Sequence, residues 1–117
     1  MTMKHRIVIF TLSLIALNPI FAQEYLRTIE IKQLHPIGNS RPSNPAMENS
    51  TRIYFKESAN WSVHGCRDDA ADLRGEDAHL LSILLMAWAT DKEISLNVDN
   101  TIKPDGEVCQ VTTLTVQ

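Results

Sequence analysis

The chain has 117 residues, with 11 basic and 14 acidic side chains, a formal net charge of −3 and a sequence pI near 5.7. This length suits one small domain, and the acidic balance argues against non-specific binding of nucleic acid or anionic lipid. Beyond the first residues, no apolar stretch approaches the length of a membrane span.

Residues 1–22 have the order of parts of a secretory signal peptide. Lys4 and Arg6 form a cationic lead, and residues 7–17 are an apolar run too short to span a bilayer. An Asn-Pro pair then interrupts the run before a small residue at the cleavage position. We therefore expect an exported protein, periplasmic or secreted, whose mature form is a single domain of residues 23–117. The mature form then contains nine basic and fourteen acidic side chains.

Three short strands are expected in the first part of the mature domain. Residues 26–34 alternate between apolar and polar side chains, which is typical of a half-buried strand. Residues 35–50 are rich in Pro, Asn and Ser and predict a long irregular loop. Residues 51–56 and 61–64 then read as a hairpin. The apolar residues expected on the buried side of these strands are Ile29, Ile31, Ile53, Phe55, Trp61 and Val63.

A helix is expected over residues 75–90, after an acidic approach over residues 68–75. The acidic side chains in its first turn interact favourably with the positive end of the helix dipole. From Leu80 to Trp88 the helix is apolar almost all the way round. A helix without a polar face has to be covered on most sides, so we predict that it fills the core and that Trp88 is buried.

Two strands and a turn complete the chain. Residues 93–99 alternate with their apolar side chains inward, and Lys103-Pro104-Asp105-Gly106 predicts a turn. Residues 107–117 form the last strand, whose apolar phase changes near residues 112–113. Such a change of phase predicts a β-bulge or a sharp bend.

The element order is strand, strand, strand, helix, strand, strand. A five-stranded OB-fold barrel has this order, with its helix between the third and fourth strands. We therefore expect a mainly β domain with one buried helix, built as an OB-fold-like barrel. The alternative is a small α+β sandwich in which the helix lies across one face of the sheet.

Cys66 and Cys109 are the only cysteines of the chain. In an oxidising compartment an isolated pair most often forms a disulfide. The alternatives are a free thiol nucleophile or a metal site that includes His64 and Cys66. Metal sites usually need three or four ligands and no CxxC spacing is present, so we predict the disulfide.

The predicted helix contains Leu84-Leu85-Met86-Ala87-Trp88-Ala89 and runs straight into the next predicted strand. This segment resembles small exported bacterial proteins that are similar to the B subunits of AB5 toxins. The resemblance covers the C-terminal two thirds of the mature chain and rests on element order and helix pattern. It implies an OB-fold barrel with one disulfide, a ring-shaped assembly and glycan ligands, and it assigns no sugar-binding residue.

One face of the predicted sheet carries candidate ligand-binding residues. Arg52, Tyr54 and Lys56 line the outward side of the second strand, and Ser62 and His64 the outward side of the third. In an OB barrel this face is a usual ligand surface. An aromatic ring between cations suits a sugar ring or an anionic group such as the carboxylate of sialic acid. The alternative is a solvated face or a subunit contact.

The sequence predicts neither a cofactor nor a metal site. Its histidines have no ligand spacing, and the acidic residues between 68 and 77 lack the pattern of a calcium-binding loop. Ser62, His64 and a nearby acid resemble the parts of a hydrolase triad, but no nucleophile elbow is present. We expect no enzymatic activity.

The expected function is therefore that of an exported, non-catalytic binding or assembly module. Its partner would be a glycan or another protein, with no nucleic acid and no membrane span, and it would form a ring or dimer through its strand edges. Two alternatives remain: a periplasmic inhibitor or accessory protein, and a small exported hydrolase that uses Ser62 and His64.

Overall fold

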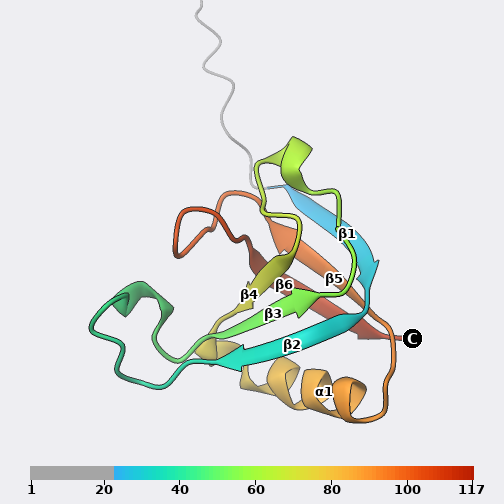
Figure 1. Ribbon diagram of the computed structural model, residues 1–117, viewed down its shortest axis with the longest axis horizontal. Coiled ribbons are helices and arrows are strands. Elements are labelled where there is room, and N and C mark those ends of the chain that lie inside the picture. Colours follow the sequence, from blue (N-terminus) through green and yellow to red (C-terminus); the bar gives the residue numbers. More distant parts are fainter. Residues whose placement is uncertain (1–22) are drawn as a thin grey trace, which may run out of the picture.

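The computed structural model describes residues 23–117, and the predicted signal peptide lies outside the described residues. In this part of the chain six strands form one sheet and a single α-helix lies beside it (Figure 1). The prediction of a mainly β domain with one helix is confirmed. No helix in the described range is long and apolar enough to cross a membrane.

The strands and the helix follow the predicted order, but the strand before the helix lies at residues 70–73 instead of residues 61–64. They are β1 (Glu24–Ile29), β2 (Ile31–Pro36), β3 (Thr51–Phe55), β4 (Ala70–Leu73), α1 (Ala78–Ala89), β5 (Ile94–Asp99) and β6 (Gln110–Val116). The order of strands across the sheet is β1-β5-β6-β4-β3-β2. All neighbours are antiparallel except β4 and β6, which are parallel and share one register pair, Asp72 and Gln110.

The first predicted strand is divided between the two ends of the sheet. β1 pairs with β5 and β2 pairs with β3, with only Glu30 between β1 and β2. Ile29 and Ile31, on either side of Glu30, are both buried as predicted. The chain thus changes its pairing partner while it keeps its apolar side toward the core. No pairing joins β1 to β2 in residues 23–117, so the sheet is not a closed barrel.

The predicted hairpin of residues 51–56 with residues 61–64 is wrong. Ser62–His64 form a short 3-10 turn, η2, which ends at Gly65 in the left-handed region (φ 83°). Trp61 before this turn is buried as predicted and lies edge-on to Phe55, but Val63 is 82% exposed. Alternation over only four residues therefore did not distinguish a strand from a turn.

The next strand after β3 is β4, which pairs with it and lies in the predicted acidic approach to the helix. All four of its residues are buried, including Asp72 at 1% exposed. A carboxylate in such a place needs a cationic partner, and Arg52 of β3 faces it across the strand pair. The acidic composition of this segment concealed a core strand.

The predicted helix is present as α1, after a 3-10 turn, η3 (Gly75–Asp77), but its predicted burial is wrong. Only Leu84 and Ala87 of α1 are buried. One side of α1 packs beside β6, and the helix lies at the lower end of the sheet in Figure 1. Its exposed large apolar side chains are Ile83 (37%), Leu85 (47%), Met86 (54%) and Trp88 (49%).

The remaining strands agree with the sequence pattern. Ile94, Leu96 and Val98 of β5 are buried. In β6 the register steps from Thr113 to Val111 while the partner strand advances by one residue, which confirms the predicted bulge. The predicted turn ends at Gly106 (φ 87°), whose N–H donates to the carbonyl of Lys103 at 2.9 Å.

The predicted disulfide is confirmed. Cys66 follows η2 and Cys109 precedes β6, and their Cα atoms lie 5.4 Å apart. Both cysteines are buried in the main hydrophobic cluster. The bond therefore fastens the irregular segment between β3 and β4 to the C-terminal strand.

Candidate functional site

The predicted ligand-binding residues of β3 have different surroundings. Arg52 is largely buried in an ion-pair network, and Tyr54 beside it on the same strand is half-buried. Lys56 follows the strand, is exposed, and forms an ion pair with Glu30 at 3.3 Å. Of these three side chains, only that of Lys56 is freely accessible, and it already has an acidic neighbour.

Ser62 and His64 lie in η2, at the top of the view in Figure 1 and away from β3. The imidazole of His64 stacks on the ring of Tyr25, with centroids 3.6 Å apart and planes inclined by 14°. The Asp68 carboxylate accepts a hydrogen bond from the backbone N–H of Ser62 at 2.7 Å. Within residues 23–117 the Ser62 hydroxyl and the His64 ring share no hydrogen bond, so the hydrolase alternative stays a prediction.

An open depression of about 550 Å³ lies beside His64 and is also lined by Asn100, Thr101 and Lys103. Its two longer polar side chains are already engaged with the backbone of the η2 segment. The Lys103 ammonium donates to the carbonyl of Gly65 at 3.0 Å, and the Asn100 amide donates to that of His64 at 3.4 Å. This depression therefore has few free polar groups with which to bind a ligand.

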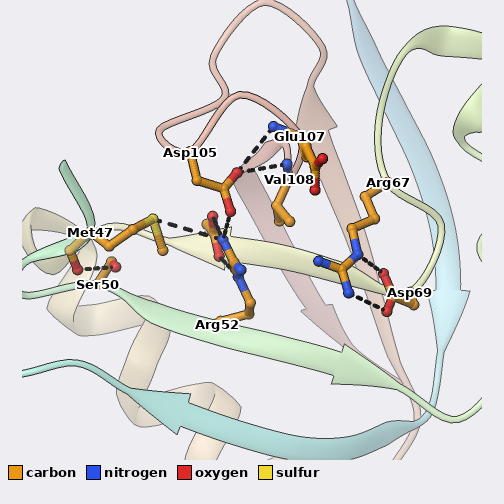
Figure 2. A network of polar contacts seen from close by, with 9 residues as sticks. Met47, Ser50, Arg52, Arg67, Asp69, Asp105, Glu107 and Val108 are labelled. Carbon is orange, nitrogen blue, oxygen red and sulfur yellow. Dashed lines mark hydrogen bonds and ion pairs between the residues drawn. The ribbon is translucent and has the colours of Figure 1, made fainter. Parts of the chain in front are cut away.

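A largely buried ion-pair network surrounds Arg52 of β3 (Figure 2). Arg52 Nε donates to Asp72 Oδ1 at 2.8 Å, and Nη2 donates to Asp72 Oδ2 at 2.9 Å and also to Asp105. The second carboxylate oxygen of Asp105 accepts from the backbone N–H groups of Glu107 and Val108, at 3.1 and 3.0 Å. The network thus joins β3, β4 and the turn that precedes β6.

The charges of this network shift one another's pKa values. The pKa of Arg52 lies above its ordinary value, mainly because its side chain donates to Asp72. Burial raises the pKa of Asp72, and Arg52 offsets only part of that effect. Burial acts in the same direction on Asp105, but the N–H groups of Val108 and Glu107 together with Arg52 outweigh it, so the pKa of Asp105 is lowered.

We expect Asp105 to make folding sensitive to acid. Because its pKa in the folded protein lies below that of the unfolded chain, about 3.9, ionised Asp105 stabilises the fold above that pH. This contribution is lost as the pH falls through the folded pKa. Urea unfolding from pH 7 to pH 3 should show a smaller acid-induced loss of stability for Asp105→Asn than for the wild type. Equal losses would contradict this role of Asp105.

A cavity of about 300 Å³ opens beside Asp72. It lies between the loop that precedes β3, the segment from β4 into η3, and the start of β6. Neither this cavity nor Gln110, which lines it, was predicted. No local pattern marks the cavity, because its walls come from segments that are far apart in the sequence.

The loop that forms one wall of this cavity is fixed to the body of the domain. Met47 at its centre is wholly buried, and the Ile37 N–H donates to the carbonyl of Ser50 at 2.8 Å. A side chain at Gly75 would place its Cβ 2.6 Å from the carbonyl oxygen of Asn49, so only glycine permits this close approach. The predicted long loop is therefore an ordered part of the cavity.

Within residues 23–117 no three His, Cys, Asp or Glu side chains are placed to share a metal ion. Comparison of the chain with protein-family models, with curated proteins and with solved structures finds no match.

Proposed function

We propose that the mature chain is an exported, disulfide-stabilised, non-catalytic binding module that works as an assembly of identical copies and binds a glycan. The Cys66–Cys109 disulfide supports export, because such bonds persist in oxidising compartments. The observation that carries the assembly is the exposed face of α1. The glycan is what the resemblance to AB5 toxin B subunits implies.

The exposed face of α1 is apolar and uncharged. From Ala78 to Ala89 there is no Asp, Glu, Lys or Arg. Four large apolar side chains of this helix stay exposed, and Met86 is the most exposed of them at 54%. Soluble monomers rarely expose large contiguous apolar patches, and such patches commonly mark interaction sites. We take this surface, made by Ile83, Leu85, Met86 and Trp88, as the assembly face.

The partner that best fits the assembly face is a second copy of the chain. In a symmetric contact a surface meets its own copy, so a face with charges of one sign would repel itself. The mature chain is acidic overall, yet this face carries no charge. The covered side of α1 packs against β6, which in the described residues pairs along its length with β5 but with β4 only at Gln110. The free edge of β6 offers a second place where copies of the chain could pair.

An OB-fold-like architecture is part of this proposal. If β1 and β2 are counted as one strand bent at Glu30, the sheet has five strands and its two ends belong to the same strand. The helix then lies between the third and fourth strands, and the third and fifth strands are parallel. This strand order supports the barrel relationship that the element order of the sequence suggested.

Solution mass tests the proposed assembly. We expect light scattering of the exported protein to give a multiple of the protomer mass, and the variant Leu85→Glu/Met86→Glu to give the protomer mass with a similar unfolding midpoint. Introduced carboxylates would have to be desolvated in the contact, which costs several kcal/mol. Val63→Glu, at a more exposed apolar residue of η2 (82%), is the control and should assemble as the wild type. A wild type that is strictly monomeric would contradict the assembly.

A further inference from the structure

Three segments of the chain form the walls of the cavity beside Asp72. One wall is the ordered loop that contains Glu48 and Ser50, the second is the segment that contains Asp72 and Arg74, and the third begins at Gln110. Asp72 and Gln110 are register partners in the parallel pair of β4 and β6. Its volume of about 300 Å³ is at the lower end of small-ligand pockets, which suits a ligand of one or two rings.

Gln110 is the most informative residue of this cavity. The residue is only 7% exposed, yet within residues 23–117 no hydrogen bond joins its side-chain amide to another group of the chain. The amide atoms are not among the unpartnered polar side-chain atoms that are sealed from solvent, and Gln110 lines the cavity. Buried polar groups are nearly always hydrogen-bonded. An amide in this position has one acceptor and two donors available to a ligand.

The charges of the cavity disfavour an anionic ligand. Its lining contains the carboxylates of Glu48, Asp72 and Glu76 but only one cation, Arg74. An anionic ligand would therefore meet an excess of negative charge. The carboxylate of Asp72 is already paired with Arg52, and one oxygen of Glu48 accepts the backbone N–H of Arg41 at 3.1 Å. The carboxylate oxygens left to a ligand are one of Glu48 and those of the exposed Glu76, which lies 4.0 Å from Arg74 Nε.

We infer that this cavity, which contains Gln110, Ser50 and Arg74, is the binding site for one uncharged sugar residue. The inference rests on the proposed binding function and gives it a site and a ligand class. Hydroxyl groups both donate and accept, so a sugar ring can pair with the Gln110 amide. It can also donate to the Ser50 hydroxyl, which itself donates to the Met47 carbonyl, and accept from the Arg74 N–H groups that Asp77 leaves free. Sialic acid and other anionic sugars are excluded by the same lining.

The test is a titration of the exported protein, observed by NMR at its side-chain amides. The probes are galactose, glucose, N-acetylglucosamine and N-acetylgalactosamine, each at millimolar concentration, with N-acetylneuraminic acid as the anionic comparison. We expect at least one neutral sugar to shift the Gln110 side-chain amide, and the anionic sugar to leave it unchanged. If no neutral sugar shifts this amide, or if only N-acetylneuraminic acid does, the inference is wrong.

Two variants separate binding from folding. Gln110→Leu removes the amide but breaks no hydrogen bond within the described residues, and Ala46→Phe fills the cavity from its exposed loop. Each should weaken sugar binding at least tenfold while the unfolding midpoint stays close to that of the wild type. Gln33→Leu, an exposed glutamine of β2, is the matched control and should bind normally. Unchanged affinity in both cavity variants would overturn the site.

The result also distinguishes this inference from the proposed function. Sugar-induced shifts confined to other residues, such as those around His64, would refute the cavity but leave a glycan-binding module. If Gln110→Leu loses sugar binding but still assembles, the ligand site and the assembly face are separate. A monomeric protein that still binds a neutral sugar at Gln110 would support the cavity and contradict the assembly.

Discussion

Replacement of Arg52 by methionine should lower the free energy of unfolding by about 3–5 kcal/mol, the usual cost of removing one partner from a buried ion pair. Asp72 would remain 1% exposed and would lose both of its hydrogen bonds to the guanidinium. Asp105 would retain the two backbone N–H groups that it already accepts from. The destabilisation should therefore come mainly from Asp72 and be visible as a lower urea midpoint.

Two further measurements identify Asp72 as the cause. Burial raises the pKa of Asp72, and removal of Arg52 takes away the main opposing influence. A carboxyl group whose folded pKa is raised destabilises the fold when it is ionised, so part of the loss in Arg52→Met should be regained as the pH is lowered. Combining Arg52→Met with Asp72→Leu should also restore much of the lost stability. A wild-type midpoint for Arg52→Met alone would show that this network contributes little.

Reduction of the disulfide should lower the free energy of unfolding by about 4 kcal/mol, from the entropy of the loop that it closes in the unfolded chain. Cys66 and Cys109 are 43 residues apart in the sequence. Removal of a native disulfide from a small secreted domain often abolishes folding at about 37 °C. The reduced protein should therefore be largely unfolded near physiological temperature.

The matched variant is Cys66→Ala/Cys109→Ala, with urea unfolding followed in the presence and absence of a thiol reductant. The wild type should lose stability on reduction, whereas the variant should unfold at the same urea concentration under both conditions. Both sulfur atoms are buried, so the variant also loses some packing and should be slightly less stable than the reduced wild type. A reduced wild type as stable as the oxidised one would contradict the proposed contribution of the bond.

Strands that depend on local periodicity could be predicted from the sequence. The alternation around Ile29 and Ile31, the inward residues of β5 and the bulge of β6 all appear where the pattern places them. In each case the apolar residues at alternate positions are the ones that face the core. Local sequence then contains the information that fixes the structure.

Features that depend on distant partners could not be predicted. β4 reads Ala-Ala-Asp-Leu, which does not alternate, and its Asp72 is buried only because Arg52 of another strand neutralises it. The apolar composition of α1 predicts a helix, but which of its sides is covered depends on the sheet beside it. The candidate site was missed for the same reason. Gln110 gives no signal until three separate segments enclose it.

The position of β1 has a consequence for the order in which the domain can fold. β1 emerges first during synthesis, but its partner β5 lies near the other end of the chain, with Glu24 opposite Asp99. Contacts between such distant segments form slowly, and until they form both segments leave strand edges open to other chains. Until β5 is available, β1 is therefore an unpaired strand with which another chain can pair. A chaperone that shields β1 in that interval should raise the yield of folded protein.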